Sequence, residues 1–498
     1  MRTDKIILHP ILFAVFPSLS YLGQIVFVMG GMSRFLLLFG TLLTGILFAL
    51  AFWFAVNYFV KDIQKSAILT SVFLFFLLSY WHFLRFIFKA LGLDQHRILF
   101  CILCVLYAIF TVLILRSGEY LKKLTHIFNV TGTVLVIIGF VRLFYTTGID
   151  LWLYQSSVKK YEDGRAADLR PQPDIYYFIL DTYGGTETLS NNKAFVDYLT
   201  KKGFYIARHS SANYCYTDTS LVSSLNFCYL KDLKQRVRKE DEITGLSGNW
   251  INGNRTFQFF RERGYKIAVY LCLYPIMDFT NIETNISKPN SLFDSINLLF
   301  LASTPAPIVF PLEWVGFLSR LFIDRDFYAM DYLIKRSETQ TPTFVFAHFW
   351  ALHPPYVFKD KDKKPKYRID SNPLYVIFQE TDNTRKGNKE RLDFYNAKLE
   401  KLLDSLLSKK GPAPIIVLQG DHSLENGENG QNLILNAYYL PDFDYRDLYN
   451  TISPVNTFRI ILNHYFGMHL RLLEDKTYYG QRVTDMLNRK SNIKRQEE

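Results

Sequence analysis

The sequence predicts a bundle of five transmembrane helices followed by an α/β domain. Almost every long uncharged run lies before residue 150, and after it short apolar strand patterns alternate with helical patterns. Acidic or histidine residues follow several of those strand patterns directly. Strands that alternate with helices predict a mostly parallel sheet that is covered by helices on both faces.

Four uncharged runs are long enough to cross a bilayer: Ile6–Ser33, Phe35–Val60, Ser66–Leu84 and Ile98–Leu115. A fifth run, about Ile127–Tyr145, contains Arg142, which a membrane tolerates if the side chain snorkels to an interface or faces the bundle. The first run is too long for a secretory core, and no small-residue cleavage site follows it. We therefore expect an integral membrane protein with an uncleaved anchor.

Basic residues in the short loops are divided unequally between the two sides of the membrane. One side has Arg2, Lys5, Lys61, Lys65, Arg116, Lys122 and Lys123, and the other has Arg34, Lys89 and Arg97, with Arg85 near the end of its span. The positive-inside rule then predicts a cytoplasmic amino terminus. Five crossings place the α/β domain on the periplasmic or extracellular side of a plasma (inner) membrane. With four crossings that domain would be cytoplasmic.

We expect four regions: a transmembrane domain at 1–147, a juxtamembrane helix and linker at 148–173, the α/β domain at 174–485 and a polar tail at 486–498. In the α/β domain, strands are expected at Ile175–Leu180, Lys266–Leu273, Thr343–Phe349, from Ile415, and at Leu433–Leu440. Helices are expected at Asn192–Lys202, Thr256–Arg263, Lys389–Lys409 and Pro454–Phe466. The basic run Lys359–Arg368 is interpreted as a solvated loop, with a lid over an anionic substrate as the alternative.

The formal net charge of +11 would suit nucleic acid, but part of the excess is the topogenic Lys and Arg of the membrane loops. No basic-aromatic nucleic-acid motif is found, so we expect no nucleic-acid partner. In an oxidising space, Cys215, Cys228 and Cys272 would allow one disulfide and one free thiol, and the three pairings remain open.

Two strand patterns end in residues that bind metals. PIIVLQGDHS, Pro414–Ser423, places Asp421 and His422 after a buried strand, and DIYYFILDTYGG places Asp181 after another, with Gly184 and Gly185 expected to let the chain turn sharply. The carboxyl edge of an α/β sheet is where sites gather, and an acid and an imidazole there suit a metal. The alternatives are a surface loop for Asp-His and a helix cap or turn former for Asp181.

Two further stretches carry nucleophile and acid candidates. Thr217 stands just before an expected helix, whose amino terminus suits an anionic substrate, although Thr217 or Asp218 would also serve as a cap. His348 and His353 lie at and after the end of a strand. We interpret His348 as a packed core residue, and His353, before two prolines, as an imidazole that is held for proton transfer.

Four motifs in this order, ILDTYGG, NYCYTDTSLVSSLN, HPPYVF and QGDHS, resemble the alkaline phosphatase and sulfatase superfamily. The chain looks like its membrane-anchored branch, which includes lipoteichoic acid synthases and phosphoethanolamine transferases; LNAYYLP and SPVNTFRIILNHYFG are also typical of sulfatase-like proteins. The resemblance covers about Asp174–Tyr479 and implies an alkaline-phosphatase-like sheet.

The resemblance implies that Asp181, Thr217, Asp421 and His422 bind one divalent ion (Mn²⁺, Mg²⁺ or Zn²⁺), and that Thr217 is the nucleophile. It makes His353 the residue that binds substrate and protonates the leaving alcohol. Ser423 replaces the usual Gly, which puts the geometry of that turn in doubt. No Cys/Ser-x-Pro-x-Arg follows the nucleophile position, so sulfate ester cleavage is disfavoured.

A single ion is favoured because the histidines of the domain other than His348, His353 and His422 are only His209, His464 and His469. The implied function is transfer of a phosphorylated alcohol, such as phosphoethanolamine or phosphoglycerol, from a membrane phospholipid donor to an envelope glycan or lipid acceptor. The alternatives are a phosphodiesterase or phosphatase that uses water, and a catalytically silent scaffold.

Overall fold

The computed structural model describes residues 6–25, 31–80, 83, 96–118, 120–157, 172–185, 193–234, 251, 253–272, 282–286, 312–336, 341–350, 382–423 and 432–479. The chain forms two compact units. The first holds Met1–Leu151 with two short later segments, and the second holds most of the remainder.

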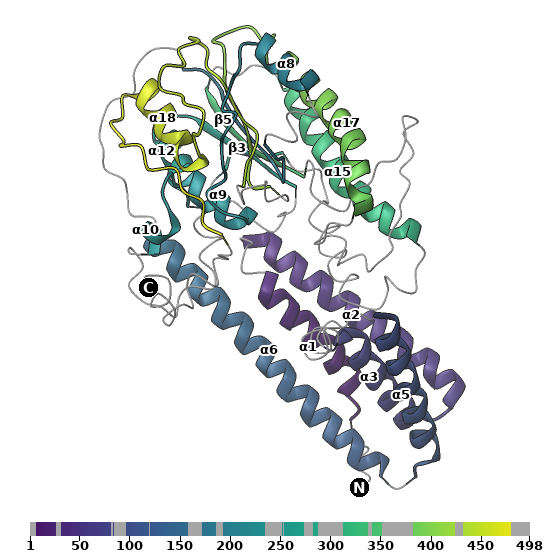
Figure 1. Ribbon diagram of the computed structural model, residues 1–498. Coiled ribbons are helices and arrows are strands. Elements are labelled where there is room, and N and C mark those ends of the chain that lie inside the picture. The colour runs from purple at the N-terminus through teal and green to yellow at the C-terminus, as the bar shows by residue number, and fades with distance from the viewer. Residues whose placement is uncertain are drawn as a thin grey trace, which may run out of the picture. The chain divides into compact units, whose positions relative to one another are not determined.

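The first unit is helical, as expected. Its helices are α1 (His9–Ile25), α2 (Gly31–Val60), α3 (Ile63–Leu78), α5 (His96–Arg116) and α6 (Leu121–Ser157) (Figure 1). Among the described residues, three segments are long and apolar enough to cross a membrane: Phe39–Val60, Ile98–Arg116 and Leu121–Phe144. The other two helices, α1 and α3, have 17 and 16 residues. Five crossings therefore remain a prediction.

The last helix of this unit, α6, continues past residue 147 into the predicted juxtamembrane region and ends at Ser157. Arg142 lies near the end of its apolar segment with an exposed side chain, so it does not point into the packed interior of the bundle. Of the two positions expected for this charge, snorkelling is the one compatible with that exposure.

Close contact between α1 and α6 depends on two glycines one heptad apart. A Cβ on Gly132 would lie 2.8 Å from the Cβ of Leu12, and one on Gly139 would lie 3.0 Å from that of Leu19. The side chain of Asn129 also accepts hydrogen bonds from the backbone N–H groups of residues 8 and 9, at 3.0 and 2.9 Å. Small residues and interhelical hydrogen bonds of this kind join helices where the hydrophobic effect gives no preference.

The second unit is built on a seven-stranded mixed sheet in the order β2-β7-β6-β1-β5-β3-β4. The strands are β1 (Ile175–Leu180), β2 (Tyr205–Ile206), β3 (Lys266–Leu271), β4 (Thr284–Asn285), β5 (Thr343–Phe349), β6 (Ile415–Gly420) and β7 (Asn436–Tyr439). The strands from β6 to β4 are parallel, as expected, whereas β7 is antiparallel to β6 and β2. The expectation of a mostly parallel sheet thus holds for its centre and not for the β2–β7 edge.

Helices of this unit lie on either side of the strands in Figure 1, α12 and α18 on one side and α8, α15 and α17 on the other. Their bounds, with those of α9 and α10, are α8 (Lys193–Lys201), α9 (Thr217–Leu225), α10 (Leu230–Lys234), α12 (Arg255–Glu262), α15 (Leu312–Lys335), α17 (Asp382–Leu407) and α18 (Pro454–Phe466).

The three central strands β1, β5 and β6 are buried at every residue. This explains why they appear in the sequence as continuous apolar runs rather than as alternating patterns. The register aligns Leu180 at the end of β1 with Phe349 of β5 and Gly420 of β6. Because these strands are parallel and in step, the residues that follow them meet at one edge of the sheet.

The turn after β1 differs from the expected one. The residue with positive φ is Thr182, at 57°, and neither Gly184 nor Gly185 adopts that conformation. A β-branched residue there is strained. The role of Gly185 is close approach: a Cβ on it would lie 2.6 Å from the Cβ of Leu433 and 2.9 Å from the backbone N of Ile434.

Gly420, the last residue of β6, has a similar role, since a Cβ on it would lie 2.4 Å from the carbonyl oxygen of Tyr183. We predict that Gly420→Ala lowers the free energy of unfolding by about 2 kcal/mol, because that carbonyl belongs to the backbone and cannot rotate away. Thermal unfolding of the purified chain measures the effect. Gly118→Ala adds the same methyl group where nothing lies within 4 Å. An equal Tm for both variants would contradict the prediction.

Candidate metal and catalytic site

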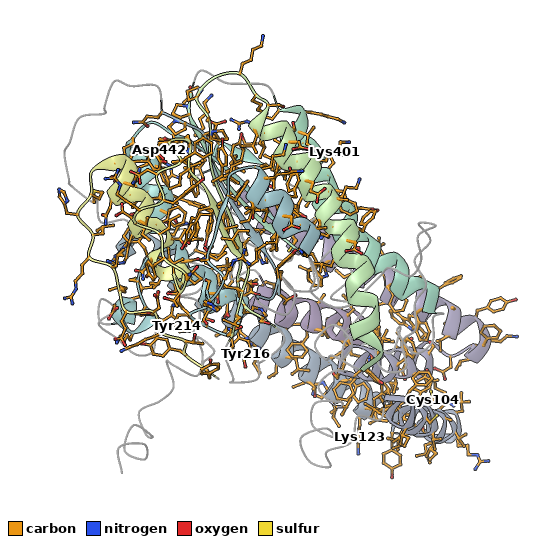
Figure 2. The ribbon with its side chains drawn as sticks, turned by 45° about the horizontal axis from the view of Figure 1, so that its top comes forward. Cys104, Lys123, Tyr214, Tyr216, Lys401 and Asp442 are labelled. Carbon is orange, nitrogen blue, oxygen red and sulfur yellow. The ribbon has the colours of Figure 1, made fainter. Side chains whose placement is uncertain are left out.

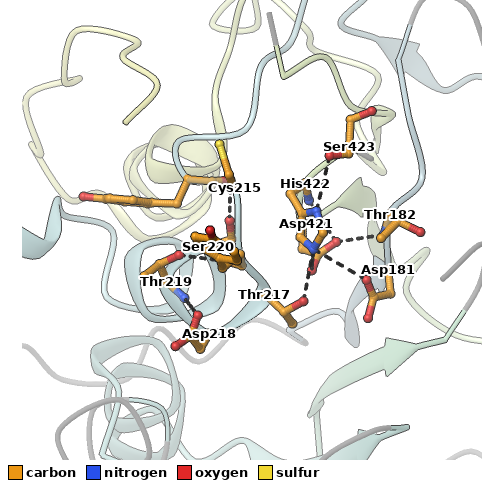
Figure 3. Close-up of polar contacts among 12 residues, drawn as sticks. Asp181, Thr182, Cys215, Thr217, Asp218, Thr219, Ser220, Asp421, His422 and Ser423 are labelled. Carbon is orange, nitrogen blue, oxygen red and sulfur yellow. Dashed lines mark hydrogen bonds and ion pairs between the residues drawn. The ribbon is translucent and has the colours of Figure 1, made fainter. Parts of the chain in front are cut away.

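Three of the expected ligands meet at the carboxyl edge of the sheet. Asp181 follows β1, and Asp421 and His422 follow β6; their exposed fractions are 0%, 2% and 8%. Each offers one ligand atom, and these three atoms lie within 4.8 Å of one another (Figure 3). The sheet register is responsible, because it places β1 and β6 side by side with their ends level.

Thr217, the fourth expected ligand, points at this cluster. It is the first residue of α9, and its Oγ1 lies 3.3 Å from Nε2 of His422. The N-cap residue of α9 is Tyr216, which lies with Tyr214 in the segment before the helix (Figure 2) and makes no side-chain cap hydrogen bond. The interpretation of Thr217 as the cap is therefore wrong, and its hydroxyl instead lies within hydrogen-bonding distance of His422.

The separations within the cluster suit ligands of a single ion. Nε2 of His422 lies 3.8 Å from Oδ1 of Asp181, 3.5 Å from Oδ2 of Asp421 and 3.3 Å from Oγ1 of Thr217. Ligand bonds of about 2.0–2.2 Å in a tetrahedral arrangement place neighbouring ligand atoms about 3.3–3.6 Å apart. Two carboxylates, an imidazole and a hydroxyl fit a divalent cation of the Mn²⁺, Mg²⁺ or Zn²⁺ type.

Hydrogen bonds fix one oxygen of Asp421 and leave the other for the cluster. Oδ1 accepts the backbone N–H groups of Thr182 at 3.0 Å and His422 at 2.8 Å, whereas buried Oδ2 accepts no hydrogen bond. Burial tends to raise the pKa of Asp421, but the His422 and His348 imidazoles and the Thr182 N–H hold it below its usual value. The carboxylate is therefore ionised at neutral pH, as a metal ligand must be.

His348 joins the cluster, although its sequence context indicated only a core residue. It is fully buried in β5, and its Nε2 lies 3.5 Å from Oδ2 of Asp181 and 3.9 Å from Oδ2 of Asp421. Burial lowers the pKa of His348 to about 4, so the imidazole is neutral near pH 7. The sequence carried one signal for this role, because His348 is the second-last residue of the predicted strand. Parallel pairing with β1 places it opposite Ile179, close to the edge of the sheet where Asp181 lies.

Ser423, which replaces the glycine usual after Asp-His, does not separate the pair from the site. Its backbone N–H donates to Oδ1 of Asn432 at 2.6 Å, and the Asn432 amide donates to the carbonyl oxygen of Tyr214 at 3.0 Å. A side chain from outside the motifs thus ties the Asp421–His422 turn to the segment that leads to Thr217.

The described residues do not include three of the predicted features: His353, the run Lys359–Arg368 and the tail 486–498. None of the five cysteines forms a disulfide in this structure: Cys101, Cys104, Cys215, Cys228 and Cys272.

No family model matches the chain, and no curated protein sequence matches it either. Solved structures that resemble it include the membrane-embedded lipooligosaccharide phosphoethanolamine transferase A of Neisseria meningitidis, at 10% identity and a TM-score of 0.39, covering 91% of this chain and 94% of that one. The periplasmic domain of a Campylobacter jejuni phosphoethanolamine transferase gives 13% identity and a TM-score of 0.37, with 59% and 90% covered. A lipoteichoic acid synthase of Listeria monocytogenes gives 10% identity and a TM-score of 0.34, with 64% and 76% covered.

These solved structures represent the two groups of enzymes that the sequence motifs resemble. At such identities and TM-scores, the similarities do not indicate what this chain binds. That question depends on its own side chains.

We predict that Asp421→Asn and His422→Ala each weaken divalent metal binding by at least about tenfold, because each removes a ligand from a site with few to spare. In Asp421→Asn the side-chain amide oxygen can still accept the Thr182 N–H, so the fold should persist. Elemental analysis after dialysis against limiting Mn²⁺ measures the loss. The matched control is Asp404→Asn, which removes a carboxylate that is 53% exposed. Wild-type metal content in either site variant would remove that residue from the ligand set.

Proposed function

We propose that the protein is a membrane-bound, metal-dependent phosphotransferase. It takes a phosphorylated alcohol of the phosphoethanolamine or phosphoglycerol type from a membrane phospholipid onto Thr217 and passes it to an envelope glycan or lipid. The observation that carries this proposal is the position of the Thr217 hydroxyl, 3.3 Å from His422 and beside two buried carboxylates.

An unassisted threonine hydroxyl is a poor nucleophile at neutral pH. One divalent ion held by Asp181, Thr217, Asp421 and His422 would supply Lewis acidity, which lowers the pKa of the hydroxyl and offsets charge on the phosphoryl oxygens. Asp181 and Asp421 provide the negative charge that retains the cation. Helix α9 starts at Thr217, so the partial positive charge of its amino terminus suits an anionic group that reacts there.

The reaction proceeds in two balanced steps. Thr217 enters as the alkoxide, its hydroxyl proton having passed to solvent, and protonated His353 is the acid. Oγ1 of Thr217 bonds to phosphorus while the bond from phosphorus to the lipid oxygen breaks, and the leaving alkoxide takes the proton from His353. The acceptor hydroxyl then gives its proton to His353 and bonds to phosphorus, which releases Thr217 as the alkoxide again. Water in place of the acceptor makes the same site a phosphodiesterase or phosphatase, the second candidate function. A sulfatase is disfavoured because no Cys/Ser-x-Pro-x-Arg follows the nucleophile position, so formylglycine cannot form there.

The apolar first unit supports this choice of substrate, since three of its described segments are long and apolar enough to cross a bilayer, which is where a phospholipid donor lies. Five crossings with a cytoplasmic amino terminus would put the α/β domain outside the inner membrane, where envelope acceptors lie.

We predict that a reporter active only in oxidising compartments gives signal when it is fused after residue 498. Five crossings and the Lys/Arg asymmetry both require this orientation. The matched control is the same reporter fused at Gly118, between α5 and α6, which should be silent. Signal from the Gly118 fusion alone would place the α/β domain in the cytoplasm and exclude an envelope acceptor.

Substitution of Thr217 tests the nucleophile. Thr217→Ala removes the attacking oxygen and should lower activity on the order of 10³-fold or more, whereas Thr217→Ser keeps an oxygen and should retain part of the activity. Mass spectrometry of the protein after incubation with phospholipid should find a phosphorylated-alcohol adduct on Thr217 in the wild type and none in Thr217→Ala.

His353→Ala tests the proposed proton transfer separately from the nucleophile. If this change slows the second transfer more than the first, the adduct on Thr217 accumulates. The adduct's release rate with and without an acceptor separates transfer from hydrolysis. Full turnover by Thr217→Ala would refute the covalent mechanism.

A further inference from the structure

A cavity of about 550 Å³ lies at the amino edge of the sheet, at the opposite end of the strands from the metal cluster. Three residues that line it, Lys266, Thr284 and Thr343, are the first residues of β3, β4 and β5. Small-molecule sites have volumes of roughly 300–1,000 Å³, so the cavity is large enough for a ligand. A strand the length of β5 spans about 20 Å, which separates the cavity from the cluster.

One face of α15 forms the other wall of the cavity. Tyr328, Asp331, Tyr332 and Lys335 all line it, at positions three, four and seven residues apart. Side chains at this spacing lie on the same face of a helix. The wall therefore combines two aromatic rings, a carboxylate and an ammonium group along two turns.

Hydrogen bonds fix the two walls relative to each other on both sides of the cavity. Toward the carboxyl edge, the hydroxyl of Tyr270 in β3 donates to Oδ1 of Asp326 in α15 at 2.7 Å. At the amino edge, the Arg336 guanidinium lies 3.4 Å from Oδ2 of Asp174 and also donates to the Thr343 hydroxyl. The cavity is preformed, so a ligand would not have to order its walls.

The side chains that line the cavity suit a phosphorylated sugar. Lys266 and Lys335 supply two positive charges, and within the described part of the chain neither lysine has an ion-pair partner. A phosphate monoester carries about −1.5 to −2 charges at pH 7, which matches two lysines. The rings of Tyr328 and Tyr332 suit the C–H face of a sugar, and the Asp331 carboxylate can accept hydrogen bonds from sugar hydroxyls.

We propose that this cavity binds a sugar that carries one phosphate monoester, with the phosphate at Lys266 and Lys335 and the sugar ring against Tyr328 and Tyr332. It is a docking site and not a second catalytic centre, because none of the proposed metal ligands lines it. Under the proposed function, such a sugar belongs to the envelope acceptor. That assignment alone rests on the proposed function, whereas binding of the sugar phosphate does not.

Isothermal titration calorimetry of the full chain in detergent tests the site, with glucose 1-phosphate as the probe. We expect one binding site per chain. Glucose and inorganic phosphate should each bind at least about tenfold more weakly, because glucose has no charge for the lysines and inorganic phosphate has no ring for the tyrosines. Absence of glucose 1-phosphate binding, or equal binding of inorganic phosphate, would overturn the proposal.

Variants of the lining residues locate the bound probe. Lys266→Gln and Lys335→Gln should each weaken glucose 1-phosphate binding at least about fivefold, because each removes one charge-assisted contact. Tyr328, which is 38% exposed, can be changed with little risk to the fold, and Tyr328→Leu should weaken the sugar phosphate but not inorganic phosphate. The matched control is Lys401→Gln, which removes an exposed lysine of α17 (Figure 2). Wild-type affinity in both lysine variants would refute the site.

Asp421→Asn separates this proposal from the proposed function. This variant should lose metal and activity and still bind glucose 1-phosphate with wild-type affinity, since Asp421 lies at the other edge of the sheet. If its affinity falls with its metal content, the sugar phosphate is bound at the metal cluster and the docking site is wrong. Failure of the Thr217 mechanism, in contrast, would leave all these titrations unchanged.

Discussion

The burial of two carboxylates side by side is the constraint on which the second unit depends. Asp181 and Asp421 are 0% and 2% exposed, and the transfer of such charges from water costs several kcal/mol each unless they are paired or bind metal. His348, whose pKa is lowered to about 4, is neutral near pH 7 and adds no positive charge. A bound cation compensates the pair most directly, which is why the metal proposal follows from burial as well as from motifs.

The rest of the sheet edge is arranged around that pair. Thr182 keeps its strained conformation while its N–H donates to Asp421 at 3.0 Å, so the strain of one turn is coupled to the position of the other carboxylate. At the end of β5, buried Asp326 of α15 accepts the Trp350 N–H at 2.8 Å and the Tyr270 hydroxyl at 2.7 Å. These bonds hold the ends of β5 and β3 level, and with them His348 and Cys272.

Much of this arrangement could be predicted from the sequence, because buried parallel strands produce long apolar runs that are hard to mistake. The bounds of β1 and β5 were predicted to the residue, and α18 likewise. The antiparallel β7 was not anticipated, since an apolar run carries no information about strand direction. His348 was assigned to the core because burial and participation in a site look identical in one sequence; only the register with β1 distinguishes them. The glycine pair after Asp181 suggested a left-handed turn, whereas close packing against the segment at Leu433 is what requires Gly185.

The short distance between Thr217 and His422 needs support from outside both motifs, and Asn432 supplies it. Its Oδ1 accepts the Ser423 N–H at 2.6 Å while its amide donates to the Tyr214 carbonyl at 3.0 Å, so one buried side chain ties the two segments together. A glycine after Asp-His would offer the same N–H, which explains why serine is accommodated there without moving His422. The geometry of the Thr217–His422 pair is therefore set by a residue that motif comparison passes over, because its contribution is made through backbone contacts. Under the proposed mechanism, a side chain that holds these two segments in register restricts Thr217 to one position before substrate arrives, and such preorganisation is where much of an enzyme's rate advantage originates.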